Sequence, residues 1–465
     1  MSEGTQSAAT MQSAEIADFN LNRLEKLAPR PNSIAETGLS ESFLSDLVAK
    51  HLLDGGVLTL AQIAERMALS GPIVRDILDF MRAEARIEVR GVSNDGSAGN
   101  LRYALTDRGR DTALDAMIRS GYVGPTPVPL ELYQRVAEAQ TVHGGGINAE
   151  RMQEPFANVV LRDGIRDQIG PALNSGRAIF IYGPAGTGKT YITQQLVNLF
   201  PDETLIPYAI AINEVVVEVF DPVIHRKIDL GLASPNIMLG SGHDPRFACC
   251  KRPAVISGGE LSSDMLEVHY DASTRRYTAP LQLKANNGVF IIDDMGRQRI
   301  APETVFNRWI VPLEEQIDYL TMGAGQHFSV PFDVVLIFST NLHPTDIADE
   351  AFLRRIGYKI EFPTLQVREY QQIWSDYCDE SDIACEGDVF DYVVHELHTD
   401  NQVPLLPCHP RDLLSIAADL AMYEGHARIV NKTNIRKAWS SYFVIANTDG
   451  PVWHNKPSAD GGYKS

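Results

Sequence analysis

Apolar residues recur at helical spacing early in the chain, between polar turn signals. A first helix is expected to begin near Glu41 and to stop at Asp54-Gly55-Gly56. The runs LTLAQIAERMAL and IVRDILDFMRAEARI are separated by Ser70-Gly71-Pro72 and predict a helix-turn-helix, whose second member is the recognition helix. The β-like runs IEVRG and LRYALTDRGRD flank the turn SNDGSAGN and predict a two-stranded wing. This part of the chain is therefore expected to fold as a small α+β unit.

With these elements, residues 39–122 resemble a winged-helix domain. Such domains often bind DNA, but residues 41–120 contain ten Lys and Arg against twelve Asp and Glu, a balance of −2. A phosphate-binding face is expected to be more basic. The arginines of the recognition helix also alternate with acidic residues, which suits contact with a protein at least as well as contact with DNA. Both partners remain hypotheses for this domain.

The periodicity changes after a proline-rich linker at residues 123–150. From residue 151 to residue 363, fully apolar runs such as AIFIYG, GVFIIDD and VVLIFSTN alternate with helical segments. That alternation predicts an α/β domain with a parallel sheet covered on both faces. Residues 364–447 have helical spacing and predict a small helical lid. Residues 1–38 and 448–465 have the composition of flexible tails.

Composition and charge narrow the class of protein. Hydrophobic residues make up 44% and charged residues 22% of the 465-residue chain, as in soluble globular proteins. No run approaches the ~18 apolar residues of a membrane span, and the start does not have the features of an export signal. Five scattered cysteines also favour a reducing compartment, so a cytoplasmic location is expected. The net charge of −19 disfavours nonspecific binding to nucleic acid.

The most specific chemical motif follows the apolar run AIFIYG. The sequence GPAGTGKT matches GxxxxGK[ST] between a predicted strand and a predicted helix, which indicates a phosphate-binding loop. Lys189 is expected to reach the β- and γ-phosphates of ATP, and the Thr190 hydroxyl is expected to ligate Mg²⁺. The expected nucleotide-binding residues of this segment are Gly183, Pro184, Ala185, Gly186, Thr187, Gly188, Lys189, Thr190 and Tyr191.

Two other apolar runs end in polar residues that suit such a site. GVFIIDD ends in Asp293 and Asp294, at the carboxyl edge of a strand where α/β proteins bind ligands. Asp293 is the better candidate for the magnesium shell, and Asp294 can polarise the attacking water. VVLIFSTN ends in Asn341. Together with the P-loop, these residues predict an ATP-hydrolysing site.

In their order along the chain, the P-loop, the acidic strand, the polar strand end and several later arginines resemble the AAA+ ATPases. The resemblance implies that Asn341 is sensor 1 and orients the lytic water. It also implies that Arg354 or Arg355, with Arg355 favoured, is the arginine finger that completes a neighbouring subunit's site. Arg411, in the first turn of a lid helix, is then sensor 2 and contacts the nucleotide. The alternative for each arginine is a surface ion pair or a helix cap.

The run from residue 286 to residue 341 is similar to MoxR-type ATPases and enhancer-binding activators, with a β-hairpin around Ile317 to Pro331. One residue departs from the family pattern, because AAA+ proteins commonly have a glutamate where this chain has Asp294. The shorter side chain of Asp294 is compatible with ATP hydrolysis that is slow or that depends on a partner.

Three functions are compatible with this resemblance, which implies self-association into a ring, most often a hexamer. The first is remodelling of a protein client, in which ATP turnover moves loops within residues 230–275. The second is a DNA-directed regulator or loader, in which residues 39–122 bind duplex DNA. The third is a nucleotide-gated switch with little hydrolysis, motivated by Asp294.

Overall fold

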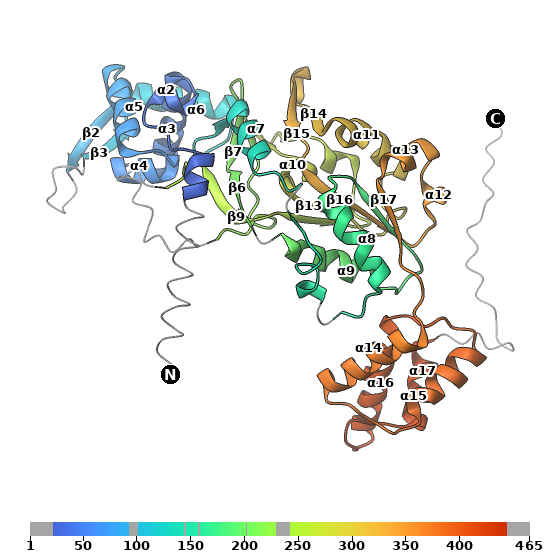
Figure 1. Cartoon of the computed structure of the whole chain (residues 1–465). Coiled ribbons are helices and arrows are strands. Elements are labelled where there is room, and N and C mark those ends of the chain that lie inside the picture. Colours follow the sequence, from blue (N-terminus) through green and yellow to red (C-terminus); the bar gives the residue numbers. More distant parts are fainter. Residues whose placement is uncertain are drawn as a thin grey trace, which may run out of the picture. The chain divides into compact units, whose positions relative to one another are not determined.

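The computed structural model describes residues 22–92, 101–143, 146–156, 159–200, 202–228 and 242–443. The chain divides into two compact units, each described by itself (Figure 1). The first runs as far as Gly183 and resumes from Lys189 to Glu361, and the second contains Pro184–Gly188 and the chain from Phe362 onward. The predictions for the tails at residues 1–21 and 448–465, for the wing turn at 93–100 and for part of the client loop at 230–241 lie outside the described residues.

Helices and a small antiparallel sheet form the amino-terminal part of the first unit. The helices are α2 (Ile34–Thr37), α3 (Glu41–Gly55), α4 (Leu60–Met67) and α5 (Gly71–Ala83). The strands are β1 (Leu58–Thr59), β3 (Leu101–Leu105) and β2 (Ile87–Val92), paired in that order. Ser40 caps α3, and Thr59 with Gln62 forms a capping box at α4. Apolar side chains of α3, α4 and α5 share one buried core.

The strand predicted over residues 101–111 is wrong beyond Leu105, because helix α6 (Asp107–Arg119) begins there. The Thr106 hydroxyl accepts a hydrogen bond from the Gly109 amide and so caps this helix. Gly109 is required for packing, because a Cβ at this position would lie 1.8 Å from the carbonyl oxygen of Arg86. The glycine thus permits the close approach of the Arg86 carbonyl oxygen to the start of α6.

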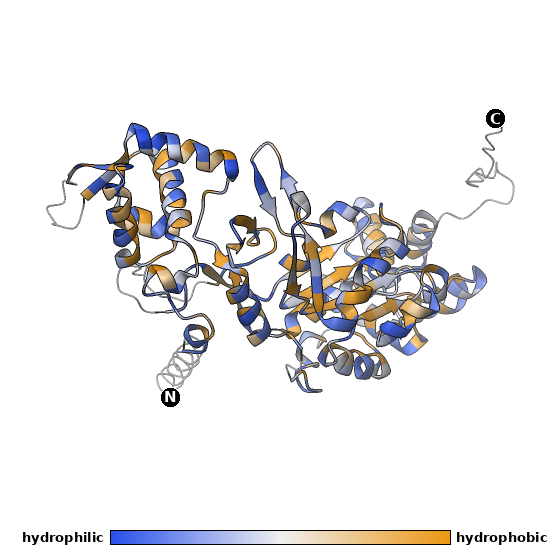
Figure 2. Cartoon of the chain, turned by 90° about the horizontal axis from the view of Figure 1, so that it is seen from above, coloured by the Kyte–Doolittle hydropathy of each residue, from blue (hydrophilic) through white to orange (hydrophobic). Residues whose placement is uncertain are grey.

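Five parallel strands form the central sheet of the first unit. Their order is β10 (Ala254–Ser257), β13 (Gly288–Ile292), β16 (Val334–Thr340), β5 (Ile179–Tyr182) and β17 (Tyr358–Glu361). Figure 2 shows apolar residues along the middle of this sheet. The strand order places β16 between the P-loop strand β5 and the acidic strand β13, so that all three carboxyl ends meet at one edge.

Helices cover both faces of the central sheet, as the alternation of strands and helices predicted (Figure 1). Helices α8 (Asp163–Asn174) and α9 (Lys189–Leu196) lie on one face, and α11 (Pro302–Glu315) and α13 (Glu350–Arg355) lie on the other. On this second face, Trp309 and Phe352 pack against Phe338 of β16. Shorter helical elements of this unit are α10 (Leu281–Lys284), α12 (Pro344–Ile347) and the 3₁₀ turns Glu154–Phe156, Val197–Leu199, Ser263–Leu266 and Gly323–Gly325.

Further strands join the central sheet to the amino-terminal helices. One sheet has the order β11 (His269–Asp271), β12 (Arg276–Thr278), β8 (Val215–Glu218), β7 (Ala209–Ile212) and β4 (Val128–Pro129). Strands β6 (Glu203–Pro207) and β9 (Phe247–Lys251) form an antiparallel pair. The hairpin expected around Ile317 to Pro331 is present as β14 (Ile317–Thr321) and β15 (His327–Pro331). Ala209 and Val216 enter the core of α3, α4 and α5, so that core is continuous with β7 and β8.

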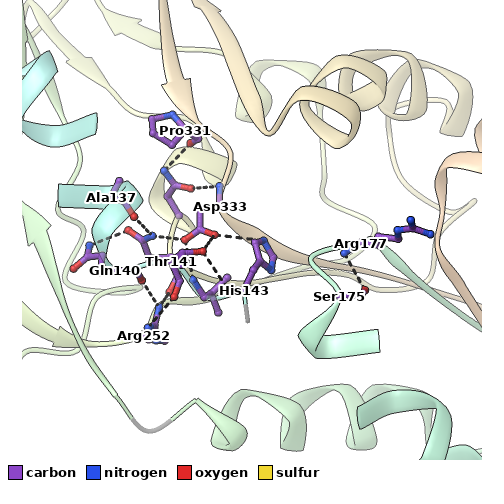
Figure 3. Close-up of polar contacts among 12 residues, drawn as sticks. Ala137, Gln140, Thr141, His143, Ser175, Arg177, Arg252, Pro331 and Asp333 are labelled. Carbon is purple, nitrogen blue, oxygen red and sulfur yellow. Dashed lines mark hydrogen bonds and ion pairs between the residues drawn. The ribbon is translucent and has the colours of Figure 1, made fainter. Parts of the chain in front are cut away.

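A buried polar cluster holds the amino ends of β13 and β16, at the edge opposite the P-loop (Figure 3). The Asp333 carboxylate accepts hydrogen bonds from the Thr141 hydroxyl at 2.7 Å and from the amide of Asn287. The Arg252 guanidinium donates to the carbonyl oxygens of Gln140 and Asn287 at 2.9 and 2.8 Å. These bonds fasten the segment after helix α7 (Leu130–Ala139) to the central sheet.

The second unit is mainly helical. Its helices are α14 (Val367–Ser381), α15 (Val389–Asp391), the π-helical continuation Tyr392–His398, α16 (Cys408–Tyr423) and α17 (Lys432–Tyr442). Strands β18 (Ala384–Cys385) and β19 (Ile429–Val430) pair in parallel. Aromatic residues fill the core, in which Trp374, Tyr370 and Trp439 are all buried. Within the described residues, no helix has the length and apolar character needed to cross a membrane.

Candidate functional site

The segment from β5 to α9 is a glycine loop between a buried strand and a helix. Gly183, Gly186 and Gly188 have φ angles of 148°, 82° and 83°, a backbone region that residues with a Cβ rarely adopt. The Thr187 hydroxyl donates to the Pro184 carbonyl oxygen at 2.9 Å. This is the strand-loop-helix context that a phosphate-binding loop requires.

Lys189 lies at the carboxyl edge of the central sheet, where its Nζ donates to the Gly183 carbonyl oxygen at 2.9 Å and to Asn341 Oδ1 at 2.8 Å. The residue is only 6% exposed. Burial lowers the pKa of this lysine, and the nearby carboxylates of Asp293 and Asp294 act in the opposite direction. The ammonium group therefore contacts the side-chain amide of Asn341 and lies near the carboxylates of Asp293 and Asp294, at the edge of the sheet where the loop begins.

Thr190 and Asp293, the two residues predicted to bind Mg²⁺, contact each other directly. The Thr190 hydroxyl donates to Asp293 Oδ2 at 2.7 Å, and the Asp293 amide donates to the Ser257 carbonyl oxygen of the neighbouring strand β10. Both side chains present hard oxygen donors, which fits Mg²⁺ because this ion usually takes one or two protein oxygens together with phosphate and water. Among the described residues, no group of three His, Cys, Asp or Glu could hold a metal ion by itself.

Asn341 links the lysine to the second acid. Its Nδ2 donates to Asp294 Oδ1 at 3.0 Å while its Oδ1 accepts from Lys189. Asp294 has a φ of 51°, a left-handed conformation that aspartate tolerates better than most residues with a Cβ. The structure thus brings together five of the predicted site residues, which are Lys189, Thr190, Asp293, Asp294 and Asn341.

The predicted arginines lie on other elements. Arg354 and Arg355 occupy the last turn of α13, where Arg354 pairs with Glu350 and Arg355 pairs with Glu314. Arg411 belongs to the second unit, where its guanidinium pairs with Asp412 and its side chain is 65% exposed. Tyr191 is 54% exposed on α9. None of the roles predicted for these four residues is shown by these contacts.

Two residues contribute to the site without having been predicted. Gln298 donates from Nε2 to the Asp293 carbonyl oxygen at 2.8 Å and accepts from the Gly296 amide, so it shapes the turn after β13. The Thr340 hydroxyl donates to the Met295 carbonyl oxygen at 2.8 Å and so joins the same turn to β16. Thr340 could have been predicted as a site residue because it directly precedes Asn341. Nothing in the local sequence identifies Gln298 as one.

Comparison with known proteins adds one partial family match and a set of distant folds. Residues 366–441 match a family described as "Domain of unknown function (DUF8689)", which covers most of the second unit and none of the P-loop. No curated protein matches the sequence.

Solved structures of the Thermotoga maritima RuvB Holliday junction branch migration motor are similar to this chain at a low level. One matches 63% of this chain and 70% of its own length, with 13% identity and a TM-score of 0.34. Two point mutants of that protein match 60% of this chain and 69% of their own, with 12% identity and TM-scores of 0.35 and 0.36. Similarities this low carry no argument about the site, so the P-loop α/β fold rests on the chain's own geometry.

Proposed function

We propose that this chain is an AAA+ ATPase, and that it hydrolyses Mg-ATP at the subunit interfaces of a ring, a hexamer, to remodel a protein client in the cytoplasm. The observation that supports the proposal most is the hydrogen-bonded set Lys189, Asn341 and Asp294, beside the Thr190–Asp293 pair. A P-loop lysine, a magnesium ligand pair and a water-orienting amide are the parts that phosphoryl transfer to water needs.

Each residue of the set has a defined task in this proposal. Lys189 and the amides of Gly183 to Thr190 bind the phosphate oxygens, and Thr190 and Asp293 would hold Mg²⁺. When bound, the ion neutralises charge on the β- and γ-phosphate oxygens. Asp294 accepts a proton from the attacking water, which Asn341 orients. Arg355 of a neighbouring subunit stabilises the charge of the transition state, and Arg411 contacts the nucleotide from the lid.

Phosphate release by the purified chain, with and without Mg²⁺, tests this proposal. Lys189→Ala removes one charge-assisted contact to phosphate, worth about 1.5–3 kcal/mol, so ATP binding is expected to weaken roughly 10- to 150-fold. Lys251→Ala, which removes an exposed lysine of β9 in the same unit, is the control and should bind ATP normally. Normal turnover by Lys189→Ala would contradict the assignment of the site.

A DNA-directed function is the alternative for the amino-terminal part. Helix α5 presents the exposed side chains of Arg75 and Arg82, although Asp76 and Asp79 are exposed on the same helix. Binding of a short duplex by the full chain that weakens steeply with salt, and that Arg75→Ala with Arg82→Ala abolishes, would favour this function over protein remodelling.

A nucleotide-gated switch is the other alternative. It is favoured by Asp294, whose side chain is one methylene shorter than the glutamate common at this position in AAA+ proteins and whose backbone is left-handed. Tight ATP binding together with turnover near zero would support it and would remove hydrolysis from the proposal.

A further inference from the structure

Two cysteines of the second unit face each other. Cys378 lies in the last turn of α14 and Cys385 lies in β18, and their sulfur atoms are 3.5 Å apart. All five cysteines of the chain are among the described residues, and all are free thiols. Both members of this pair are partly exposed, whereas Cys249 and Cys250 are buried in the first unit. The pair therefore combines contact between two sulfurs with access to solvent.

Backbone hydrogen bonds and strand pairing hold the two chain segments that carry these sulfurs. The Cys378 carbonyl oxygen accepts a hydrogen bond from the amide of Asp382, the left-handed C-cap of α14, and another at 3.0 Å from the amide of Ile383. Cys385 is held from the other side, because it pairs with Val430 in the parallel β18–β19 sheet. The segment from Cys378 to Cys385 is thus a tight corner with hydrogen bonds at both ends.

The surroundings of the pair distinguish its two members chemically. A hydrogen bond from Cys378 lowers the pKa of the Cys385 thiol, burial opposes this, and a hydrogen bond from Trp374 lowers it further. The hydrogen bond to Cys385 raises the pKa of Cys378, and burial adds to the effect. Burial raises the pKa of Cys249 and Cys250 to about 12, which keeps both as unreactive thiols. Cys385 is therefore the nucleophile of the pair.

We propose that Cys378 and Cys385 are a redox-active thiol pair, which glutathione disulfide converts reversibly into an intramolecular disulfide. The Cys385 thiolate attacks one sulfur of the oxidant, so a mixed disulfide forms, the oxidant's sulfur–sulfur bond breaks and one glutathione thiolate leaves. Cys378 gives its proton to water and attacks the Cys385 sulfur, which expels the second glutathione thiolate. Two protein thiols lose two electrons, and one glutathione disulfide becomes two glutathione molecules.

The disulfide would tie the end of α14 covalently to β18 and, through its pairing, to β19. In a reducing cytosol the pair stays as two thiols, and disulfides that do form there are usually transient or redox-sensing. Trp374, which hydrogen-bonds to Cys385, supplies a spectroscopic signal because its indole ring lies beside the sulfur that changes. This inference does not depend on ATP hydrolysis.

Thiol counting on the full chain tests the proposal. The protein is equilibrated in glutathione buffers of increasing disulfide content, quenched with acid, alkylated and digested. The masses of the resulting peptides are then measured by mass spectrometry. We expect two of the five thiols to disappear together in one transition, with a peptide that links Cys378 to Cys385. Tryptophan fluorescence should change in parallel, and dithiothreitol should restore both signals.

Two matched variants make the outcome specific. Cys378→Ser should leave Cys385 with one stable glutathione adduct and no internal disulfide. Cys408→Ser removes another partly buried cysteine of the same unit and should leave the transition unchanged. The proposal is overturned if both thiols remain alkylatable in the most oxidising buffer while circular dichroism shows the native fold. It is also overturned if the disulfide that forms includes Cys408.

Discussion

Asn341 is the residue on which the hydrogen bonds of the candidate site converge. Its side chain accepts from Lys189 through oxygen and donates to Asp294 through nitrogen, which only an amide can do at the same time at this length. An aspartate in this place could not donate, and a serine would not reach both partners. The two bonds set the distance between the Lys189 ammonium group and the Asp294 carboxylate, which bind phosphate and accept the proton of the water in our proposal.

Asn341→Ala is expected to leave ATP binding within a few-fold of the wild type and to lower the turnover number roughly 100-fold. The binding contacts of the P-loop remain, but the attacking water loses its orienting group. Nucleotide titration and phosphate release measure the two effects separately. Asn198→Ala, which removes an exposed amide that donates to Gln195, is the matched control. Equal losses for the two variants would show that Asn341 has no special part in turnover.

Asp294→Asn is expected to reduce turnover by about 100- to 10,000-fold, because an amide cannot accept the proton of the attacking water. Asparagine tolerates the left-handed backbone of this position and keeps a hydrogen-bonding oxygen for Asn341, so the fold and ATP binding should be unchanged. Phosphate release by a variant with a wild-type melting temperature measures this effect. Unaltered turnover would remove Asp294 from the mechanism.

At the scale of elements, the candidate site could be predicted where an apolar strand-like run is directly followed by residues that can bind phosphate, magnesium or water. The apolar runs that became β13 and β16 are each followed by a polar residue of the candidate site, and the run that became β5 is followed by the glycine loop, so both the strands and their edge could be inferred. Strand β10 was not predicted, because its four residues enter the sheet only through pairing with β13, a contact that local sequence does not specify. Helix α6 was missed because its first residues were assigned to the β-like run LRYALTDRGRD, although Gly109 packs against Arg86 inside a helix.

The second unit is expected to lose stability in acid because of His409 at the start of α16. This residue is 3% exposed, lies among the rings of His398, Tyr442 and Phe443, and has its pKa lowered by burial from 6.5 to about 4. The nearby charge of His398 lowers this pKa further, and Asp412 opposes the shift. The unfolded chain takes up the proton near pH 6.5 and the folded unit takes it up near pH 4. Between these values the unfolded state binds more protons, so the free energy of unfolding falls as the pH falls.

The expected loss from His409 is about 2 kcal/mol between pH 7 and pH 5. Urea unfolding of the full chain, followed by tryptophan fluorescence at both pH values, measures it. His409→Phe should reduce this pH dependence, whereas His426→Gln, at an exposed position of the same unit, should leave it unchanged. Equal pH dependence in all three proteins would contradict the explanation.

At the scale of the whole molecule, the central proposal is that a site on one subunit is completed by another. Within the described residues of this single chain, Lys189, Asn341 and Asp294 contact one another, while Arg354 and Arg355 form ion pairs at the end of α13. Partly exposed ion pairs contribute little stability, so Arg355, whose pair with Glu314 has side-chain exposures of 30% and 51%, could exchange it for the phosphate of a neighbouring subunit's nucleotide at small cost. The proposal requires Arg355 to leave this ion pair when the ring assembles.

Arg355→Ala is expected to keep ATP binding and to lower turnover by about 1,000-fold or more, since an arginine supplied by a neighbour is worth this much in related chemistry. Arg354→Ala removes the other candidate for this role and should have a small effect. Mixing Arg355→Ala with Lys189→Ala should restore part of the activity, because mixed rings contain sites with an intact lysine from one subunit and an intact arginine from the next. Absence of any recovery on mixing would contradict sharing of the site.

The most direct test of the account is steady-state ATP hydrolysis over a series of protein concentrations, with and without duplex DNA. We predict that turnover per chain rises steeply with concentration, as subunits assemble and complete one another's sites, and that DNA leaves it unchanged. Turnover per chain that is independent of concentration over the range where assembly occurs would contradict a shared site. Strong stimulation by DNA would contradict a protein client as the partner.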